Sequence, residues 1–343
     1  MKPRVITFGE IMLRLSPPSF QRLSQARSFE LAFGGAEANV AVSLAQFGVS
    51  ASYVTRLPHN PLAEGCLQFL RQYGVETADI VWGGSRVGIY FMERGAAQRG
   101  GEVIYDRATS ALTTIEPGMV DWEAILSKGD WFHWTGITPA VSEGAAAACR
   151  EAVETARRLG LTISCDLNYR SRLWKWGRHP KQVMPDLVRA CDLLIGSPWT
   201  AHQMLGCHGL EEEAKDDGMA AHRAFFEELG RQFPRIGLIA VTLREPLSAS
   251  HNTWSGLLWD GQTMFRAATY DIFPIVDRIG AGDAFTAGLI FSLLRNDAGK
   301  QRAIDFAVAA SCLKHTVEGD VNQVSVEEVE RLMETDAAGR MRR

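Results

Sequence analysis

Short apolar segments alternate with helical patterns along most of this chain, and that alternation restricts the fold more than any other feature. Apolar runs of strand length occupy residues 5–9, 52–54, 131–136, 161–166, 192–196 and 236–242. Helical periodicity separates several of them, at residues 61–73, 142–159 and 219–233. Strands that alternate with helices usually form a parallel sheet. The pattern therefore predicts an α/β protein with a mostly parallel central sheet covered by helices on both faces.

Two further stretches do not fit the regular alternation. Residues 11–16 alternate in polarity and precede Pro17-Pro18, which is typical of an edge strand or hairpin. Residues 87–92 and 102–107 are two strand patterns around a polar turn. Together they predict a small β layer inserted between α/β units. We expect one domain over residues 1–335, with this layer at about 11–32 and 85–108, and a short basic tail at 336–343.

Composition excludes several classes of protein. The 343 residues carry a formal net charge of −4, so no nucleic-acid or anionic-membrane partner is implied. No segment approaches the ~20 apolar residues of a membrane span, and no signal-peptide core precedes the first strand. The six cysteines lie far apart and form no CxxC pair, which predicts reduced thiols rather than a metal site. We expect a cytoplasmic protein without a dedicated metal-ligand cluster.

A glycine-rich turn runs into a helix at Gly280-Ala281-Gly282-Asp283. Glycine lets the backbone approach a ligand closely, and the first N–H groups of a helix have no intrahelical partner. The helix dipole adds positive potential there, so a phosphate fits this end. Asp283 would sit in the first turn, aimed at the bound anion. On local chemistry alone, a capped helix with an acidic first turn is the alternative.

A second glycine pair, Gly34-Gly35, precedes a predicted helix that contains Asn39. A plain turn would explain the two glycines. We favour a substrate site, in which the backbone lies close to a ligand and Asn39 donates to its hydroxyls. No other nucleotide motif competes, because a Walker A sequence and a complete dinucleotide fingerprint are both missing.

Two arginines suggest the charge of the substrate. Arg107 shares a predicted strand face with Tyr105, and Arg170 follows Asp166 beyond the carboxyl end of a strand, where open α/β sheets bind ligands. A sugar acid needs a cationic clamp for its carboxylate, whereas a neutral sugar does not. Taken singly, each arginine is better explained by a surface or lid salt bridge.

The glycine-rich turn, with Asp277 upstream, resembles the signature of the ribokinase-like (PfkB) sugar kinases. The resemblance implies that Gly280, Ala281 and Gly282 hold the transferring phosphoryl group and that Asp283 accepts the proton of the attacking hydroxyl. The Gly34-Gly35 segment with Asn39 resembles the substrate-binding signature of the same family. In this family the small β layer is a lid over the sugar and often mediates dimerisation, so we expect a homo-oligomer.

Within that family the chain is similar to the 2-keto-3-deoxygluconate kinases. The similarity rests on Tyr90, on Tyr105 with Arg107, on residues 166–174 with Arg170, and on residues 314–320 with Lys314. It implies that tyrosines and arginines contact the keto-acid end and that ATP, with Mg²⁺, phosphorylates the terminal hydroxyl. The alternatives are a fructokinase-like neutral ketose kinase and a sugar-binding pseudokinase.

Two segments depart from the family pattern. Residues 197–200, beginning at Ser197, replace the usual Asn-x-x-Glu that organises Mg²⁺. Residues 243–248 replace a Gly-x-x-Gly nucleotide loop, and there Arg244 is either a phosphate contact or a surface arginine. The predicted nucleotide-binding residues are Ser197, Arg244, Gly280, Gly282 and Lys314.

Overall fold

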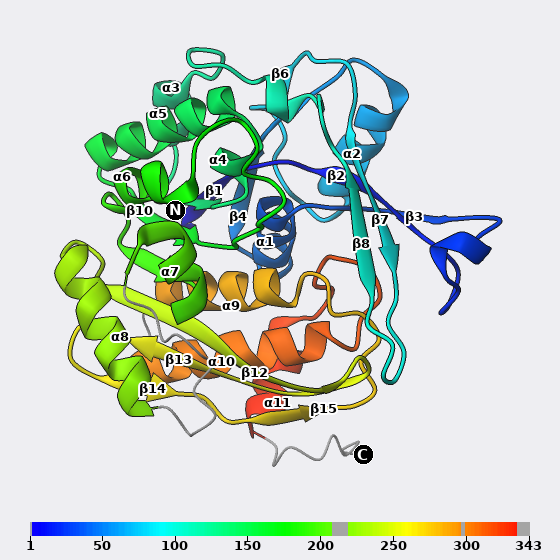
Figure 1. Ribbon diagram of the computed structural model, residues 1–343. Coiled ribbons are helices and arrows are strands. Elements are labelled where there is room, and N and C mark those ends of the chain that lie inside the picture. Colours follow the sequence, from blue (N-terminus) through cyan, green and yellow to red (C-terminus); the bar gives the residue numbers. More distant parts are fainter. Residues whose placement is uncertain (1, 208–218, 296–298, 335–343) are drawn as a thin grey trace.

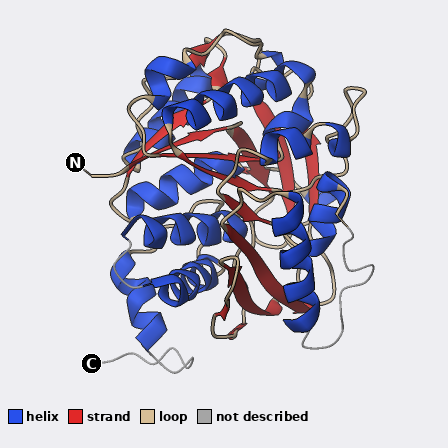
Figure 2. Cartoon of the chain, turned by 90° about the vertical axis from the view of Figure 1, so that its left-hand side faces the viewer, coloured by secondary structure: helices blue, strands red, loops and turns tan. Residues whose placement is uncertain are grey.

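The computed structural model describes residues 2–207, 219–295 and 299–334, so the tail predicted at 336–343 lies outside the described residues. A large sheet runs through the molecule with helices on both sides (Figures 1 and 2). Its strands are ordered β14-β13-β12-β11-β10-β9-β1-β4, and β15 pairs with β13. All pairs from β12 to β4 are parallel, and β13 and β14 are added antiparallel. The predicted fold class is therefore confirmed.

The strands of the large sheet are β1 (Arg4–Phe8), β4 (Ser50–Val54), β9 (Trp131–Thr135), β10 (Thr162–Asp166), β11 (Leu193–Ile195), β12 (Leu238–Ser248), β13 (His251–Trp259), β14 (Met264–Arg266) and β15 (Tyr270–Ile272). The helices are α1 (Ala36–Gln46), α2 (Pro61–Gln72), α3 (Trp122–Leu126), α4 (Thr138–Val141), α5 (Glu143–Leu159), α6 (Met184–Val188), α7 (Pro198–Leu205), α8 (Met219–Gln232), α9 (Ala281–Arg295), α10 (Gly299–Lys314) and α11 (Val326–Glu334). A two-stranded pair joins β5 (Arg56–Leu57) to β6 (Val81–Trp82).

Successive residues of the parallel strands enter two different hydrophobic cores. Val5 of β1 packs into the core with α1, α9 and α10, whereas Ile6 packs into the core with α3, α5 and α8. Leu193 and Leu194 of β11 divide in the same way. Because both faces are covered, adjacent residues of one strand can both be apolar, and such short apolar runs made the strands recognisable in the sequence. Each such buried aliphatic side chain contributes roughly 1.5–3 kcal/mol.

Helix α5 shows how local sequence sets the helical boundaries. The Ser142 side chain accepts the Ala145 N–H at 3.0 Å and caps the first turn. Gly160 ends the helix with a left-handed φ of 80°, a conformation that side chains with a Cβ disfavour. Among its residues, Ala148 and Ala152 are buried, and these small side chains let the helix approach the sheet closely.

A second sheet of four strands projects from the body at the right of Figure 1, and we call it the lid sheet. Its order is β3 (Glu30–Gly34), β2 (Met12–Ser16), β7 (Gly88–Glu93) and β8 (Glu102–Asp106). The central pair β2–β7 is parallel, and both outer pairs are antiparallel. No described helix is long and apolar enough to cross a membrane.

One strand differs from its predicted extent. The sequence predicted a strand over 236–242 followed by a loop, but β12 continues to Ser248. Its distal half pairs with β13, where Arg244 lies opposite Trp254. The hairpin partner supplies the hydrogen bonds, so this part of β12 persists although its residues 244–247 are exposed.

Candidate active site

A cavity of about 240 Å³ lies between the lid sheet and the carboxyl edge of the large sheet. Glu10 follows β1 and Asp166 ends β10, so both come from the edge where α/β sheets bind ligands. Tyr90, from β7, closes the cavity from the lid. The predicted site residues that line it are Gly35, Asn39, Tyr90, Tyr105, Arg107, Arg170, Gly280, Gly282 and Asp283.

Asp283 lies in the first turn of α9 at the base of this cavity, as predicted, and its side chain is buried. Burial raises the pKa of Asp283 to about 7, and the nearby carboxylates of Asp166 and Asp320 push it in the same direction. The side-chain amide of Asn39 opposes the rise by donating to Asp283 Oδ2 at 2.7 Å. A carboxylate with a pKa near neutrality is suited to accept a proton during turnover.

The glycine-rich turn ends at the start of α9. Gly280 has a φ of 80°, and a Cβ there would collide with the Asp320 carbonyl oxygen. A Cβ on Gly282 would meet no atom within 4 Å, because this glycine faces open space in the cavity. The first N–H groups of α9 therefore border a hollow with room for an anion. Ala281, the remaining predicted residue of the turn, is buried and does not line the cavity.

Gly34 and Gly35 lie where the lid sheet joins α1. A Cβ on Gly35 would collide with the Glu10 carbonyl oxygen, and one on Gly34 would collide with the Asp320 carboxylate. Gly35 lines the cavity, whereas Gly34 does not. The side-chain oxygen of Asn39 accepts the Gly35 N–H at 3.3 Å, so Asn39 contacts both the glycine turn and Asp283.

The arginines of the cavity differ in their partners. Arg107 is buried and forms an ion pair with Glu10, a residue that the sequence did not single out. Glu10 Oε1 is buried and has no hydrogen-bond partner among the described residues. Arg170 is exposed, donates to the Tyr169 carbonyl at 3.3 Å, and forms no ion pair within the described part of the chain. Arg170 is thus the more available cation for a bound carboxylate.

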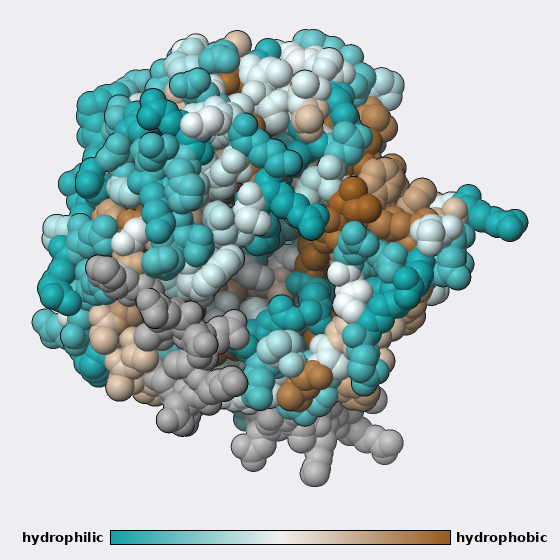
Figure 3. Space-filling model, viewed as in Figure 1, coloured by the Kyte–Doolittle hydropathy of each residue, from teal (hydrophilic) through white to brown (hydrophobic). Residues whose placement is uncertain are grey.

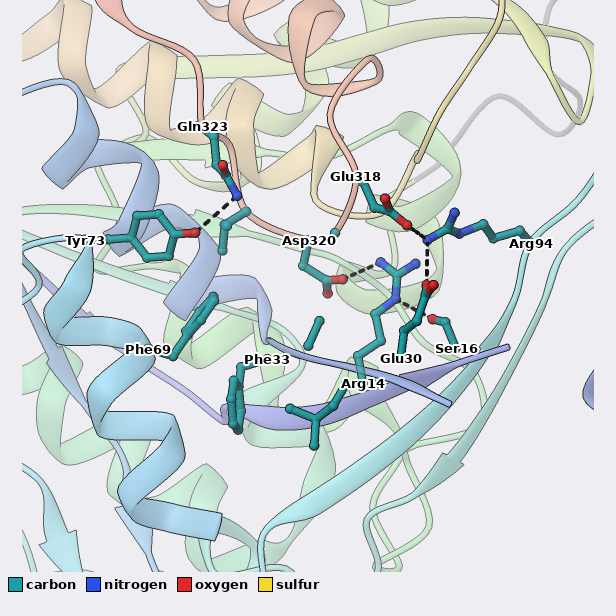
Figure 4. Close-up of a pocket in the computed structure, with 14 residues that line it drawn as sticks. Arg14, Ser16, Glu30, Phe33, Phe69, Tyr73, Arg94, Glu318, Asp320 and Gln323 are labelled. Atoms are coloured by element: carbon teal, nitrogen blue, oxygen red, sulfur yellow. Dashed lines mark hydrogen bonds and ion pairs between the residues drawn. The ribbon is translucent and has the colours of Figure 1, made fainter. Parts of the chain in front are cut away.

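A buried ion-pair network lies beside the turn, and its centre, Arg14, was not among the predicted site residues. The Arg14 guanidinium pairs with Asp277 Oδ2 at 2.6 Å and with Asp320 Oδ1 at 2.7 Å. Its Nε donates to Ser16 Oγ at 2.9 Å (Figure 4). The Tyr90 hydroxyl donates to the other oxygen of Asp320. The two aspartates lie more than 260 residues from Arg14 along the chain, so no local motif joins them to it.

Three of the predicted nucleotide-binding residues lie outside the cavity. Ser197 caps α7, where its hydroxyl accepts the Thr200 N–H at 3.2 Å. Arg244 is exposed on β12, close enough to Arg278 for the two charges to interact. Lys314 is fully buried, and its ammonium donates to the carbonyl oxygens of Asp277 at 3.3 Å and Val317 at 3.1 Å. Burial lowers the pKa of Lys314, and its nearest carboxylates oppose that effect.

Apolar side chains gather over the lid strands on the face shown in Figure 3. The exposed apolar residues of the lid region include Phe29, Leu31 and Ile104. Leu31 and Ile104 are on the outer strands β3 and β8. Monomeric proteins seldom leave such side chains grouped on one surface, so this surface is a candidate contact with another chain.

Known proteins are similar to this chain in both sequence and fold. Residues 2–229 match the sequence profile of the family described as "pfkB family carbohydrate kinase". A 2-dehydro-3-deoxygalactonokinase of Haloferax volcanii is 34% identical over 340 residues, covering 99% of each chain. A 2-dehydro-3-deoxygluconokinase of Thermoproteus tenax is 30% identical, covering 92% of this chain and 89% of the relative. The crystal structure of a 2-dehydro-3-deoxygluconokinase from Thermotoga maritima superposes with a TM-score of 0.92 at 42% identity, covering 98% and 99%. The chain belongs to the pfkB family of carbohydrate kinases.

Proposed function

We propose that this chain transfers the terminal phosphoryl group of ATP to the terminal hydroxyl of 2-keto-3-deoxygluconate. The observation that carries the proposal is a single cavity that holds a near-neutral carboxylate, a glycine-rich helix start and cationic arginines. The three similar proteins reported above are named for 2-keto-3-deoxy sugar acids, which supports this substrate class.

Each part of the cavity has a distinct task in this reaction. Asp283 accepts the proton of the attacking hydroxyl, and Asn39 holds its carboxylate in place. The amides at Gly280, Ala281 and Gly282 stabilise the charge of the transferring phosphoryl group. Arg170 and Arg107 attract the substrate carboxylate at the lid side.

Mg²⁺ would accompany the nucleotide. Among the described residues, no group of three potential metal-ligating side chains is present. Kinases commonly hold Mg²⁺ with one or two carboxylates plus the substrate phosphates, so a cavity with few protein ligands fits this ion. Asp166 is the carboxylate we assign to it, because Asp166 lines the cavity and its Oδ1 accepts only the Asn168 N–H in the described structure. When bound, the ion neutralises phosphate charge.

The predicted nucleotide contacts at Ser197, Arg244 and Lys314 remain proposals. Arg278 lines the cavity, and the positive charge of Arg244 lies close to it. This placement supports a role for Arg244 in attracting phosphate. Lys314 would act from beneath the turn, by holding backbone carbonyls rather than by touching the nucleotide.

We also propose that two copies pair through the lid sheet. Phe29, Leu31 and Ile104 would be buried in such a dimer. Light scattering after size-exclusion chromatography tests this: Leu31→Lys with Ile104→Lys should yield a monomer, and a wild-type monomer would contradict it. The six free cysteines support a reducing, cytoplasmic location.

The substrate class is tested by one arginine and a matched neighbour. Arg170→Ala should lower kcat/KM for 2-keto-3-deoxygluconate roughly 10- to 150-fold, because a charge-assisted hydrogen bond contributes about 1.5–3 kcal/mol. Turnover of fructose, which has no carboxylate, should fall much less. Arg172→Ala removes an exposed arginine of the same loop that does not line the cavity, and should leave both activities unchanged. Equal losses on the two substrates in Arg170→Ala would favour a neutral ketose kinase.

A further inference from the structure

Arg14 connects the lid sheet to the two loops that shape the glycine-rich turn. Its side chain leaves β2 and is 2% exposed. The two aspartates that it pairs come from different loops, since Asp277 precedes α9 and Asp320 follows α10. A guanidinium can hold two carboxylates at once because its donors point in fixed, separate directions. Arg14 therefore fixes the two loops relative to each other and to the lid.

Both loops contact the turn directly. Asp277 accepts the Ile279 N–H at 3.1 Å and the Gly319 N–H at 3.2 Å, so its carboxylate orders the backbone on each side. The Asp320 carbonyl oxygen lies so close to Gly280 that only glycine fits. Any shift of Asp320 would therefore move the turn or open a gap beside it.

The same Asp320 is held from the cavity side. The Tyr90 hydroxyl donates to Asp320, and Tyr90 lines the cavity assigned to the sugar acid. A continuous set of buried contacts thus runs from a lid residue in the cavity, through Asp320 and Arg14, to Asp277 and the turn. Behind Arg14 and Asp320 lies a second cavity of about 310 Å³ (Figure 4), so packing alone does not fix these side chains on that side.

We propose that Arg14 is a positioning residue that couples binding of the sugar acid under the lid to formation of the phosphate-binding turn. The proposal rests on the proposed function for the identity of the two ligands. When the sugar acid binds and orders the lid, Arg14 holds both aspartates in place. The backbone amides of the turn are then positioned to bind phosphate. Each ligand then binds more tightly when the other is present, by the same factor.

Calorimetry measures this factor. The dissociation constant of the magnesium complex of a non-hydrolysable ATP analogue is determined without and with saturating 2-keto-3-deoxygluconate. Wild type should show at least a roughly fivefold tightening, the lower end of typical coupling between sites. In Arg14→Gln and in Asp320→Asn the ratio should fall to near one. Arg94→Gln is the control, because Arg94 joins the lid to Glu318 in the same loop without touching either aspartate.

Further variants keep the test decisive if Arg14→Gln does not fold. Arg14→Lys keeps a positive charge but lacks the separate guanidinium donors that bind both carboxylates at once. This variant should fold and lose most of the coupling between the two ligands. Tyr90→Phe removes only the hydroxyl that reaches Asp320 and should lower the ratio as well. A folded Asp320→Asn or Arg14→Lys variant with the wild-type ratio would overturn the proposal, as would a wild-type ratio of one. A chain that does not turn over the keto acid would instead refute the proposed function.

Discussion

Replacing Asn39 by Ala should move the acid limb of the pH–rate profile to higher pH. Asn39 donates a 2.7 Å hydrogen bond to Asp283, and this bond lowers the pKa of a carboxyl group that burial and its acidic neighbours raise to about 7. Without the donor, the charged form of Asp283 loses a partner and its pKa must rise. Because a general base works only when it is ionised, activity at a given acidic pH must then fall.

The size of the shift follows from the strength of the bond. A hydrogen bond to a charged group contributes about 1.5–3 kcal/mol, and ~1.36 kcal/mol corresponds to one pKa unit. The pKa of Asp283 should therefore increase by roughly 1 to 2 in Asn39→Ala. At pH 7 the ionised fraction would drop from about one half to between about a tenth and a hundredth, so kcat/KM should fall roughly 5- to 50-fold. Most of this loss should disappear above pH 9.

The assay is kcat/KM for the sugar acid as a function of pH, because this ratio reports ionisation of the free enzyme. Ser43→Ala is the matched control. Ser43 lies one turn further along α1 and donates to the backbone carbonyl of Asn39 at 2.9 Å, without contacting Asp283. Its profile should keep the wild-type acid limb. If Asn39→Ala lowers the whole profile evenly and leaves the limb in place, Asn39 acts on the substrate and the reasoning is wrong.

Three further substitutions test other parts of the site. Asp283→Asn should reduce kcat by ~10²–10⁴-fold. The same variant should be more stable than wild type above pH 7, by up to roughly 4 kcal/mol, because the folded state holds this proton to about pH 7 while the unfolded chain releases it near pH 4. That gain should shrink as the pH falls from 7 to 4, which urea unfolding at several pH values measures. Arg244→Ala should raise the KM for ATP more than the KM for sugar in steady-state kinetics, and a selective change in the sugar KM would count against it. Lys314→Met should cost about 1–3 kcal/mol of unfolding free energy, because one buried and one partly buried carbonyl lose their donor. Lys300→Met, at a half-exposed ion pair, should cost less than ~1 kcal/mol, and equal losses would contradict the assignment.

The fold was predictable because its strands are buried on both faces. Trp131, Phe132 and Trp134 make up most of one strand and residues 193–195 are apolar throughout, so these segments stand out without any knowledge of their neighbours. The distal part of β12 was missed for the opposite reason. Residues 244–246 are exposed and carry no strand-like apolar pattern, and only pairing with β13 makes them a strand.

The position of the glycine-rich turn at a helix start was predictable because its signal is local in sequence. Gly280, Gly282 and Asp283 lie within four positions, and their spacing alone indicates an anion site at a helix start. Arg14 was not predictable in this way. It alternates with Leu13 and Leu15 in a strand, where a charged residue normally indicates a solvent-exposed face, yet its partners come from the other end of the chain. Contacts over such separations depend on the assembled fold.

The most direct test of the central claim is turnover by the wild-type protein. Coupled measurement of ATP consumption gives kcat/KM for 2-keto-3-deoxygluconate, its galactonate counterpart, fructose and ribose under identical conditions. We predict that at least one keto acid exceeds both neutral sugars by ~10²-fold or more, since a charge-assisted contact is worth about 1.5–3 kcal/mol and the cavity offers two arginines. Fructose or ribose turned over as well as the keto acids, or no ATP consumed with any of them, would contradict the account.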